Sequence, residues 1–105
     1  MDNKEILLVV DAVSNEKGID REIIFEAIEA ALATASRKLS PMDIDARVDI
    51  HRESGEYDTY RRWEVISDNE ELEYPDRQIY ITDAEEKIAD IEIGGEVRQG
   101  LATMD

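Results

Sequence analysis

Hydrophobic residues in the first forty positions recur at helical spacing in two stretches. The first stripe consists of Ile6, Val9, Val10 and Val13, and Leu7 and Ala12 widen it. Apolar residues three and four positions apart lie on one face of a helix, so this stretch predicts an amphipathic helix. Asn3 can cap its start, and Gly18 after Lys17 is a typical helix stop. We expect this apolar face, and that of the next helix, to belong to the hydrophobic core.

The second stripe predicts a longer helix. It consists of Ile24, Ala27, Ile28, Ala31, Leu32, Ala35 and Leu39. Asp20 can cap its start, and Ser40-Pro41 ends it because the residue before a proline avoids helical geometry. Five alanines between positions 27 and 35 leave a low-relief face that lets a neighbouring element approach closely.

The period then changes from helical to alternating. Ile44, Ala46, Val48 and Ile50 alternate with polar residues, which is typical of a half-buried strand. Ser54-Gly55 is a turn signal. The following segment, 57–66, is rich in aromatic and β-branched residues. The two strands therefore predict an antiparallel hairpin.

The remaining third carries weaker signals. Its predicted elements are an acidic loop over 68–76, a short strand over 78–81, a short helix over 83–89 capped by Thr82, a strand and turn over 91–95, and a strand over 96–102. Glu85 and Glu86 would lie in the first turn of that short helix, where their charge suits the helix dipole. The fold class predicted is α+β, a single domain over 1–105. Two packed helices join a small head built on the hairpin, with additional short strands and a short helix.

Net charge is the most unusual feature of the composition. The chain of 105 residues has 27 Asp and Glu against 12 Lys and Arg, a formal net charge of -15. Residues 64–105 hold thirteen of the acids and three of the bases, so the last third is an acidic pole. Such a chain repels phosphates on average and is steered towards basic protein surfaces. Solubility or a salt-adapted source would also explain the magnitude.

Candidate chemistry is sparse. The chain has no Cys and a single His, His51, at the polar end of a predicted strand. Neither a catalytic constellation nor a phosphate-binding glycine loop is evident. We therefore expect no enzyme activity, no cofactor, no metal and no small-molecule substrate. The polar start lacks a signal-peptide pattern, and the longest apolar run, 6–10, is too short for a membrane span. The chain is expected to be cytoplasmic.

One basic cluster stands out from the acidic background. Tyr60, Arg61, Arg62 and Trp63 are consecutive on a predicted strand, and alternation sends Arg61 and Trp63 to one face and Tyr60 and Arg62 to the other. Arginines beside aromatic rings can hold phosphates or bases. They can equally brace the hairpin through acids on neighbouring strand positions, and this structural interpretation is the one we favour. Arg37 and Lys38, at a helix end, suit the helix dipole or a phosphate.

The order of these residues resembles the N-terminal domain of the NusA transcription factor family. The resemblance rests on the segments 3–7, 9–10, 12–17, 21–22, 24–27, 29 and 31–35, on 44–45, 47–48, 50 and 54–55 of the hairpin, on 57–63, on 79–84 and on 94–97. The segment 57–63, Tyr-Asp-Thr-Tyr-Arg-Arg-Trp, is the most recognisable of them. The match is collinear and covers nearly the whole chain.

The resemblance implies a factor that modulates transcription elongation, pausing, termination and antitermination. It implies docking on RNA polymerase near the RNA exit channel, at the flap of the β subunit. Nascent RNA would be bound mainly by S1 and KH domains that are absent here, with no membrane involved. Within this chain the matching RNA-contact candidates are Arg37, Lys38, Arg61 and Arg62. We expect the acidic pole to face polymerase, through Glu85, Glu86, Asp90 and Glu92.

The family's domain also continues into a long helix that packs beside the first two. The chain of 105 residues is therefore expected to be truncated before that helix, which would leave part of the alanine-rich face of the second helix uncovered. Apart from the resemblance, an acidic protein that mimics nucleic acid or inhibits a basic partner is the alternative. A mimic should spread its carboxylates in rows over one surface, whereas this chain gathers its acids towards the C-terminus.

Overall fold

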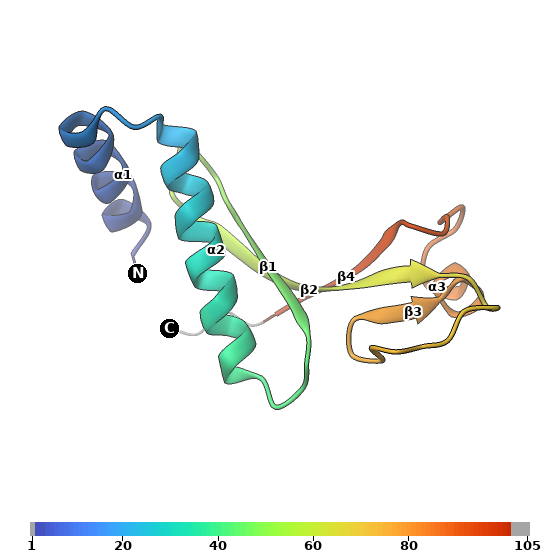
Figure 1. The fold of residues 1–105 in the computed structure, drawn as a ribbon. Coiled ribbons are helices and arrows are strands. Elements are labelled where there is room, and N and C mark those ends of the chain that lie inside the picture. Colours follow the sequence, from blue (N-terminus) through green and yellow to red (C-terminus); the bar gives the residue numbers. More distant parts are fainter. Residues whose placement is uncertain (1, 102–105) are drawn as a thin grey trace.

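The computed structural model describes residues 2–101 and shows the predicted α+β architecture. Its elements are α1 (Asn3–Lys17), α2 (Arg21–Leu39), β1 (Asp45–Ile50), β2 (Tyr57–Ile66), β3 (Gln78–Tyr80), α3 (Ile81–Lys87) and β4 (Glu96–Gly100). The molecule is elongated, 51 × 27 × 21 Å. α1 and α2 lie at one end, here called the body, and α3 and β3 lie at the other end, the head (Figure 1). The strand β2 runs from the body to the head.

The two body helices begin and end largely where their capping residues predict. Asp20 caps α2 by accepting a hydrogen bond from the Glu22 amide at 2.9 Å. Gly18 ends α1 in the left-handed conformation at φ 65°, which glycine adopts without steric cost. The prediction that Asn3 caps α1 is wrong. The Asp2 carboxylate does so instead, accepting from the Lys4 amide at 2.9 Å, where its negative charge also suits the helix dipole.

The body has its own hydrophobic core, in which both helices pack on the hairpin. Its buried members are Ile6, Val10, Ile24, Phe25, Ala33, Val48 and Ile50. Val9 and Leu39, both predicted to be buried, are 39% and 66% exposed, and the predicted stripe residues Ala12, Ala27, Ala31 and Ala35 are exposed too, so those assignments are wrong. Leu7 packs against this core from α1 as predicted, because the buried face is centred between Ile6 and Val10.

The tip of the hairpin is fixed to the body. Gly55 in the turn has φ 78°, and a Cβ atom placed on it would overlap the Asn3 carbonyl oxygen. Next to the turn, the Arg52 guanidinium bonds Glu22 and Glu29 at 2.6 and 2.8 Å. It also stacks on Phe25 at 4.7 Å. The hairpin tip therefore contacts both helices.

β2 is the central strand of a four-stranded mixed sheet. Antiparallel β1 pairs with residues 57–62 and antiparallel β4 with residues 60–64, whereas β3 is parallel to residues 64–66. The end of β2 builds a second, smaller core in the head, from Val65, Ala84 and Val97. No described residue belongs to both cores. The sheet therefore connects the two ends.

The weak signals of the last third predicted its boundaries less accurately. α3 spans Ile81–Lys87 rather than 83–89, and its N-cap residue Tyr80 makes no side-chain capping bond. Thr82, the predicted cap, lies inside the helix and donates its hydroxyl to Asp68. The helix begins early because Ile81 packs on the head core. As a result, Glu85 and Glu86 lie beyond the first turn.

Of the strand and turn predicted over 91–95, the turn is present and the strand is not. Gly94 has φ 89° and donates its amide to the Val65 carbonyl at 2.9 Å. Ile91 packs on the head core from the turn. The last predicted strand is confirmed as β4 up to Gly100; its predicted end at Ala102 lies outside the described residues.

Candidate functional site

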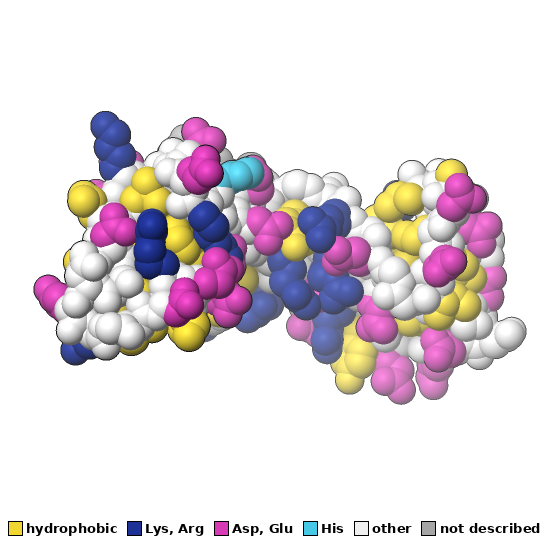
Figure 2. Space-filling model, turned by 90° about the horizontal axis from the view of Figure 1, so that it is seen from above, with side chains coloured by type: hydrophobic (Ala, Val, Ile, Leu, Met, Phe, Trp, Pro, Cys, Tyr) yellow, Lys and Arg dark blue, Asp and Glu magenta, His cyan; other side chains and the backbone are white. Residues whose placement is uncertain are grey.

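Charged side chains are segregated along the molecule (Figure 2). Lys and Arg side chains gather at the middle of the molecule, between body and head, while Asp and Glu side chains surround hydrophobic ones on the head. We call the middle region the waist; it comprises β2 residues 60–63 with their partners on β1 and β4. The waist and the head are the two candidate surfaces that the sequence predicted.

The predicted RNA-contact residues of β2 point to opposite faces of the sheet, as their alternation indicated. The Arg62 guanidinium lies 3.0 Å from Asp45 and 2.7 Å from Glu96. On the other face, Arg61 donates to the Asp76 carbonyl at 2.6 Å and stacks 4.2 Å over Trp63. Both arginines are therefore engaged within the domain, and the favoured interpretation of Arg62 as a brace is confirmed at Asp45.

Arg37 and Lys38 lie in the last turn of α2 and are exposed. Arg37 donates to the Thr34 hydroxyl at 3.0 Å and to the Ala46 carbonyl at 3.4 Å. It lines a hollow of about 380 Å³ between α2 and the sheet, together with Arg47 and Tyr60. Arg37 thus lies at the edge of β1, whose Ala46 carbonyl it reaches, whereas Arg61 lies on the face of the sheet that α2 covers and lines the groove beside Leu39.

Two further arginines, Arg47 and Arg98, lie at the waist on the same face of the sheet as Arg62. Their side chains are about half exposed. Arg47 bonds Asp45 at 2.9 Å. Arg98 bonds Glu96 at 2.6 Å and stacks 4.5 Å over Tyr60. Sequence reasoning missed Arg98 because its place opposite Arg62 depends on the register of β2 with β4.

The contacts keep the waist carboxylates ionised. Partial burial opposes ionisation of Asp45, but hydrogen bonds from Arg47 and Arg62 outweigh it and lower the pKa of Asp45. Hydrogen bonding by Arg98, with a further bond from Arg62, lowers the pKa of Glu96. Burial raises the pKa of the Tyr60 phenol, so the ring stays neutral at physiological pH. The waist therefore carries arginines paired with carboxylates rather than an uncompensated cationic patch.

The four predicted polymerase-contact residues all lie in the head and are all exposed. Glu85 and Glu86 are on α3, and Asp90 and Glu92 follow it. Two large apolar side chains in the same segment are also exposed, Ile88 by 41% and Ile93 by 59%. The head thus presents carboxylates next to apolar surface, an arrangement that suits a protein partner with basic and apolar side chains.

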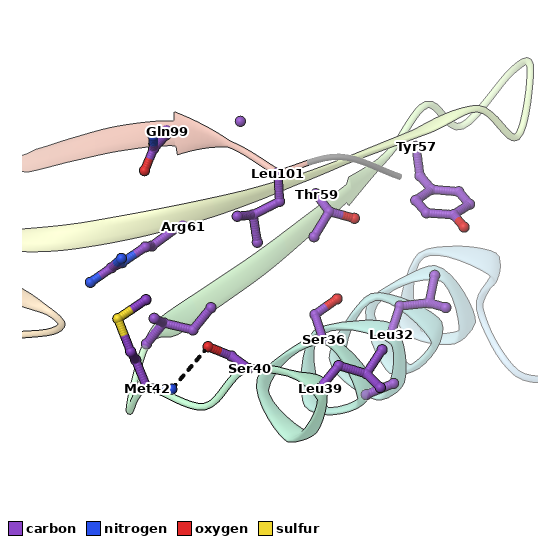
Figure 3. Close-up of a pocket in the computed structure, with 13 residues that line it drawn as sticks. Leu32, Ser36, Leu39, Ser40, Met42, Tyr57, Thr59, Arg61, Gln99 and Leu101 are labelled. Carbon is purple, nitrogen blue, oxygen red and sulfur yellow. Dashed lines mark hydrogen bonds between the residues drawn. The ribbon is translucent and has the colours of Figure 1, made fainter. Parts of the chain in front are cut away.

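A third feature is an apolar groove of about 610 Å³ beside the C-terminal half of α2 (Figure 3). It is lined by Leu32, Leu39, Met42, Tyr57 and Leu101, among others. Leu39 is 66% exposed at its edge. The groove continues an exposed ridge of α2 with a spacing of four residues, made of Ile23, Ala27, Ala31, Ala35 and Leu39.

Within residues 2–101 the structure offers little to a catalytic or metal-binding function. No group of three or more His, Asp or Glu side chains there is arranged to hold a metal ion. His51 is exposed, with its Nε2 3.4 Å from a carboxylate oxygen of Asp58. None of the described helices is both long and apolar enough to cross a membrane.

Comparison with known proteins decides the family. The NusA N-terminal domain model matches residues 5–105. The chain belongs to the NusA N-terminal domain family. Its sequence is 33% identical over 103 residues to the transcription termination/antitermination proteins NusA of Rickettsia conorii and Rickettsia prowazekii. These alignments cover 98% of this chain and 20% of each relative, so the chain spans about a fifth of their length.

A solved structure of the family shares the fold. The solution structure of the N-terminal domain of NusA from B. subtilis matches with a TM-score of 0.73 and 30% sequence identity, covering 99% of this chain and 82% of that one. The resemblance to NusA and the α+β fold class predicted from the sequence are both confirmed. The family is one of bacterial transcription termination and antitermination factors.

Proposed function

We propose that this NusA N-terminal domain docks on RNA polymerase at the β-subunit flap, near the RNA exit channel, and so modulates pausing and termination. The observation that carries the proposal is the acidic head. Its exposed carboxylates, Glu85, Glu86, Asp90 and Glu92, lie in one short segment with the exposed apolar residues Ile88 and Ile93. Charge at a rim steers association, and a central apolar contact supplies most of the affinity.

We propose nascent RNA as a second partner, contacted at the C-terminal end of α2. Arg37 and Lys38 lie on an exposed helix end, and the half-exposed Arg47 lines the same hollow as Arg37. Arg61 and Arg62 make contacts inside the domain, so we do not expect them to touch RNA. Because the waist arginines are paired with carboxylates, we expect the main RNA affinity in S1 and KH domains of a longer chain.

The longer domain of the family suggests an occupant for the apolar groove. We propose that a helix following residue 105 in a longer chain packs along the exposed α2 ridge. Alanine at three of the five ridge positions allows close approach of a helix axis, and the ridge runs the length of α2. Covering Leu39 and Met42, which are 66% and 46% exposed, would remove apolar surface from water.

The alternative of an acidic nucleic-acid mimic is disfavoured by charge placement. A mimic needs phosphate-like rows of carboxylates, whereas the waist acids Asp45 and Glu96 are paired with arginines. The exposed acids of the segment 85–92 lie together on the head instead, beside apolar side chains. No catalytic role is proposed, and a transcription factor of this kind acts in the cytoplasm.

Titration of the isolated flap region of bacterial RNA polymerase into this domain tests the proposal. Binding that weakens as the salt concentration rises is expected, because electrostatic steering is screened by ions. Absence of binding to a demonstrably folded domain, at low and moderate salt, would contradict polymerase docking by residues 1–105.

A further inference from the structure

Between the two hydrophobic clusters, body and head are connected by the backbone ladder of β1, β2 and β4, by the buried Ile44 and Ala46, and by polar side-chain contacts. The body core ends at Val48 and Ile50 on β1 and at Tyr57 on β2. The head core begins at Trp63 and Val65, farther along β2. Between them lies the segment 60–62, whose side chains make charged, stacking and hydrogen-bonding contacts.

On one face of the waist these contacts form a continuous chain of charges across three strands. Arg62 on β2 joins Asp45 on β1 at 3.0 Å to Glu96 on β4 at 2.7 Å. Each carboxylate takes a second arginine, Arg47 at 2.9 Å and Arg98 at 2.6 Å respectively. The chain therefore alternates base and acid from one side of β2 to the other.

On the opposite face a second set of contacts ties the loop before β1 to the loop before β3. The Asp43 amide donates to the Asp76 carboxylate at 3.1 Å, and the Asp43 carboxylate accepts from Arg77 at 3.3 Å. Arg61 donates to the Asp76 carbonyl at 2.6 Å. Asp43 follows the body helix α2, and Asp76 and Arg77 precede the head strand β3.

We propose that these two sets of charged contacts form a releasable brace that fixes the angle between body and head. Ions that compete for the waist arginines would loosen the head without unfolding either core. Salt weakens the outer pairs of this chain of charges most, because Arg47 and Arg98 are about half exposed and the Debye length falls from ~10 Å at about 0.1 M to ~3 Å at about 1 M. Burial of apolar side chains is not weakened in that way. Head and body then reorient as units.

The proposal does not depend on polymerase docking. If the head does dock on polymerase, ligand binding at the waist would regulate that docking. A polyanion that binds the exposed Arg47 and Arg98 competes with Asp45 and Glu96 for the same guanidiniums. Release of Glu96 removes a side-chain tie between β2 and β4, the strand that carries the chain from the head back to the body, and leaves their backbone pairing in place. Occupation of the waist would thereby be transmitted to the orientation of the head.

Pulsed dipolar EPR between one spin label on each end tests the brace. The chain has no Cys, so single cysteines at Asn15→Cys on α1 and Lys87→Cys on α3, both exposed, give one label pair. We expect a narrow distance distribution at low salt that broadens at high salt. We expect the same broadening at low salt in Arg62→Gln. The matched control is Arg21→Gln, which removes an exposed ion pair to Asp11 within the body and should leave the distribution narrow.

Near-UV circular dichroism and the fluorescence of Trp63, the single Trp, check that both cores persist in each sample. A distribution unchanged by salt and by Arg62→Gln in a folded domain overturns the proposal. If Arg62→Gln fails to fold, Arg98→Gln is used in its place. It removes only the exposed arginine at the β4 end of the row of alternating charges. A narrow distribution in that variant, together with no effect of salt, overturns the proposal equally.

Discussion

Arg62 and Asp45 face each other across β2 and β1, with the Arg62 Nη1 atom 3.0 Å from the Asp45 Oδ2 atom. The same guanidinium reaches Glu96 on the other neighbouring strand at 2.7 Å. One side chain thus connects three strands where the two cores leave a gap. The side chains of Arg62 and Asp45 are each only 21% exposed, so solvent screens their interaction less than that of a surface pair.

Removing Arg62 should destabilise the domain more than removing Arg47. Arg62→Gln leaves two partly buried carboxylates with fewer partners, and we expect a loss of about 1–3 kcal/mol in the free energy of unfolding. Arg47 is half exposed and pairs with Asp45 at the edge of the sheet, so Arg47→Gln should cost less than about 1 kcal/mol. Urea unfolding of the two variants makes the comparison. Equal losses would contradict the central place given to Arg62.

The cost of Arg62→Gln should depend on pH in a definite direction. The pKa values of Asp45 and Glu96 are lowered from their ordinary values of 3.8 and 4.5 by their arginine partners. Groups with a depressed folded pKa contribute stability above their unfolded pKa, and that contribution is lost as pH falls through the folded pKa. The difference between wild type and Arg62→Gln should therefore be full at pH 7 and shrink below about pH 4.

Measuring that difference, rather than the stability of wild type alone, removes a competing effect. Protonation of a chain with net charge -15 also relieves general repulsion, which stabilises the compact state in both proteins. Urea unfolding at several pH values between neutrality and the acid limit supplies the data. A difference that grows on acidification would show that Arg62 does not act through these carboxylates.

The hairpin turn offers a test of close packing against α1. Gly55→Ala should cost about 2 kcal/mol or more, because the new Cβ meets the Asn3 carbonyl in addition to the strain of a positive φ. Gly18→Ala is the matched control: its φ is similarly positive, at 65°, but nothing lies within 4 Å of the added atom. Its cost should be about 1 kcal/mol. Thermal or urea unfolding distinguishes the two, and similar costs would argue against a fixed hairpin tip.

RNA contact should depend on the exposed Arg37 and Lys38 rather than on Arg61 and Arg62, which make contacts inside the domain. Replacing Arg37 and Lys38 by Gln should weaken crosslinking of this domain to nascent RNA in a transcription complex, and lower the salt dependence of that contact, because phosphate contacts release counterions. Replacing Lys4 and Lys17, two exposed lysines of α1, makes the same charge change away from the waist. If both double variants lose crosslinking equally, the contact is not localised at the end of α2.

Sequence patterns correctly predicted features that depend on neighbouring residues in the chain, such as strand alternation and helix ends. Alternation along β2 correctly separated Arg61 from Arg62, and the chemistry of Gly18 and Asp20 correctly placed two helix ends. The contacts that β4 contributes could not be predicted, because Arg98 meets Tyr60 through the pairing of two strands that lie far apart in the chain. The start of α3 was misplaced for a similar reason. Thr82 is the better cap by local propensity, but packing of Ile81 on the head core decides the boundary.

The central claim is that the acidic head is the surface that docks on polymerase, and one comparison of binding tests it most directly. The head variant replaces Glu85, Glu86 and Glu92 by Gln and Asp90 by Asn. The body variant makes the same charge change at four exposed acids, Glu16, Glu26, Glu53 and Glu56. Both are titrated against the isolated flap region of RNA polymerase at low and moderate salt. We predict that the head variant binds at least about tenfold more weakly than wild type, while the body variant binds as wild type does. Equal binding by all three proteins, or a loss confined to the body variant, would contradict the claim.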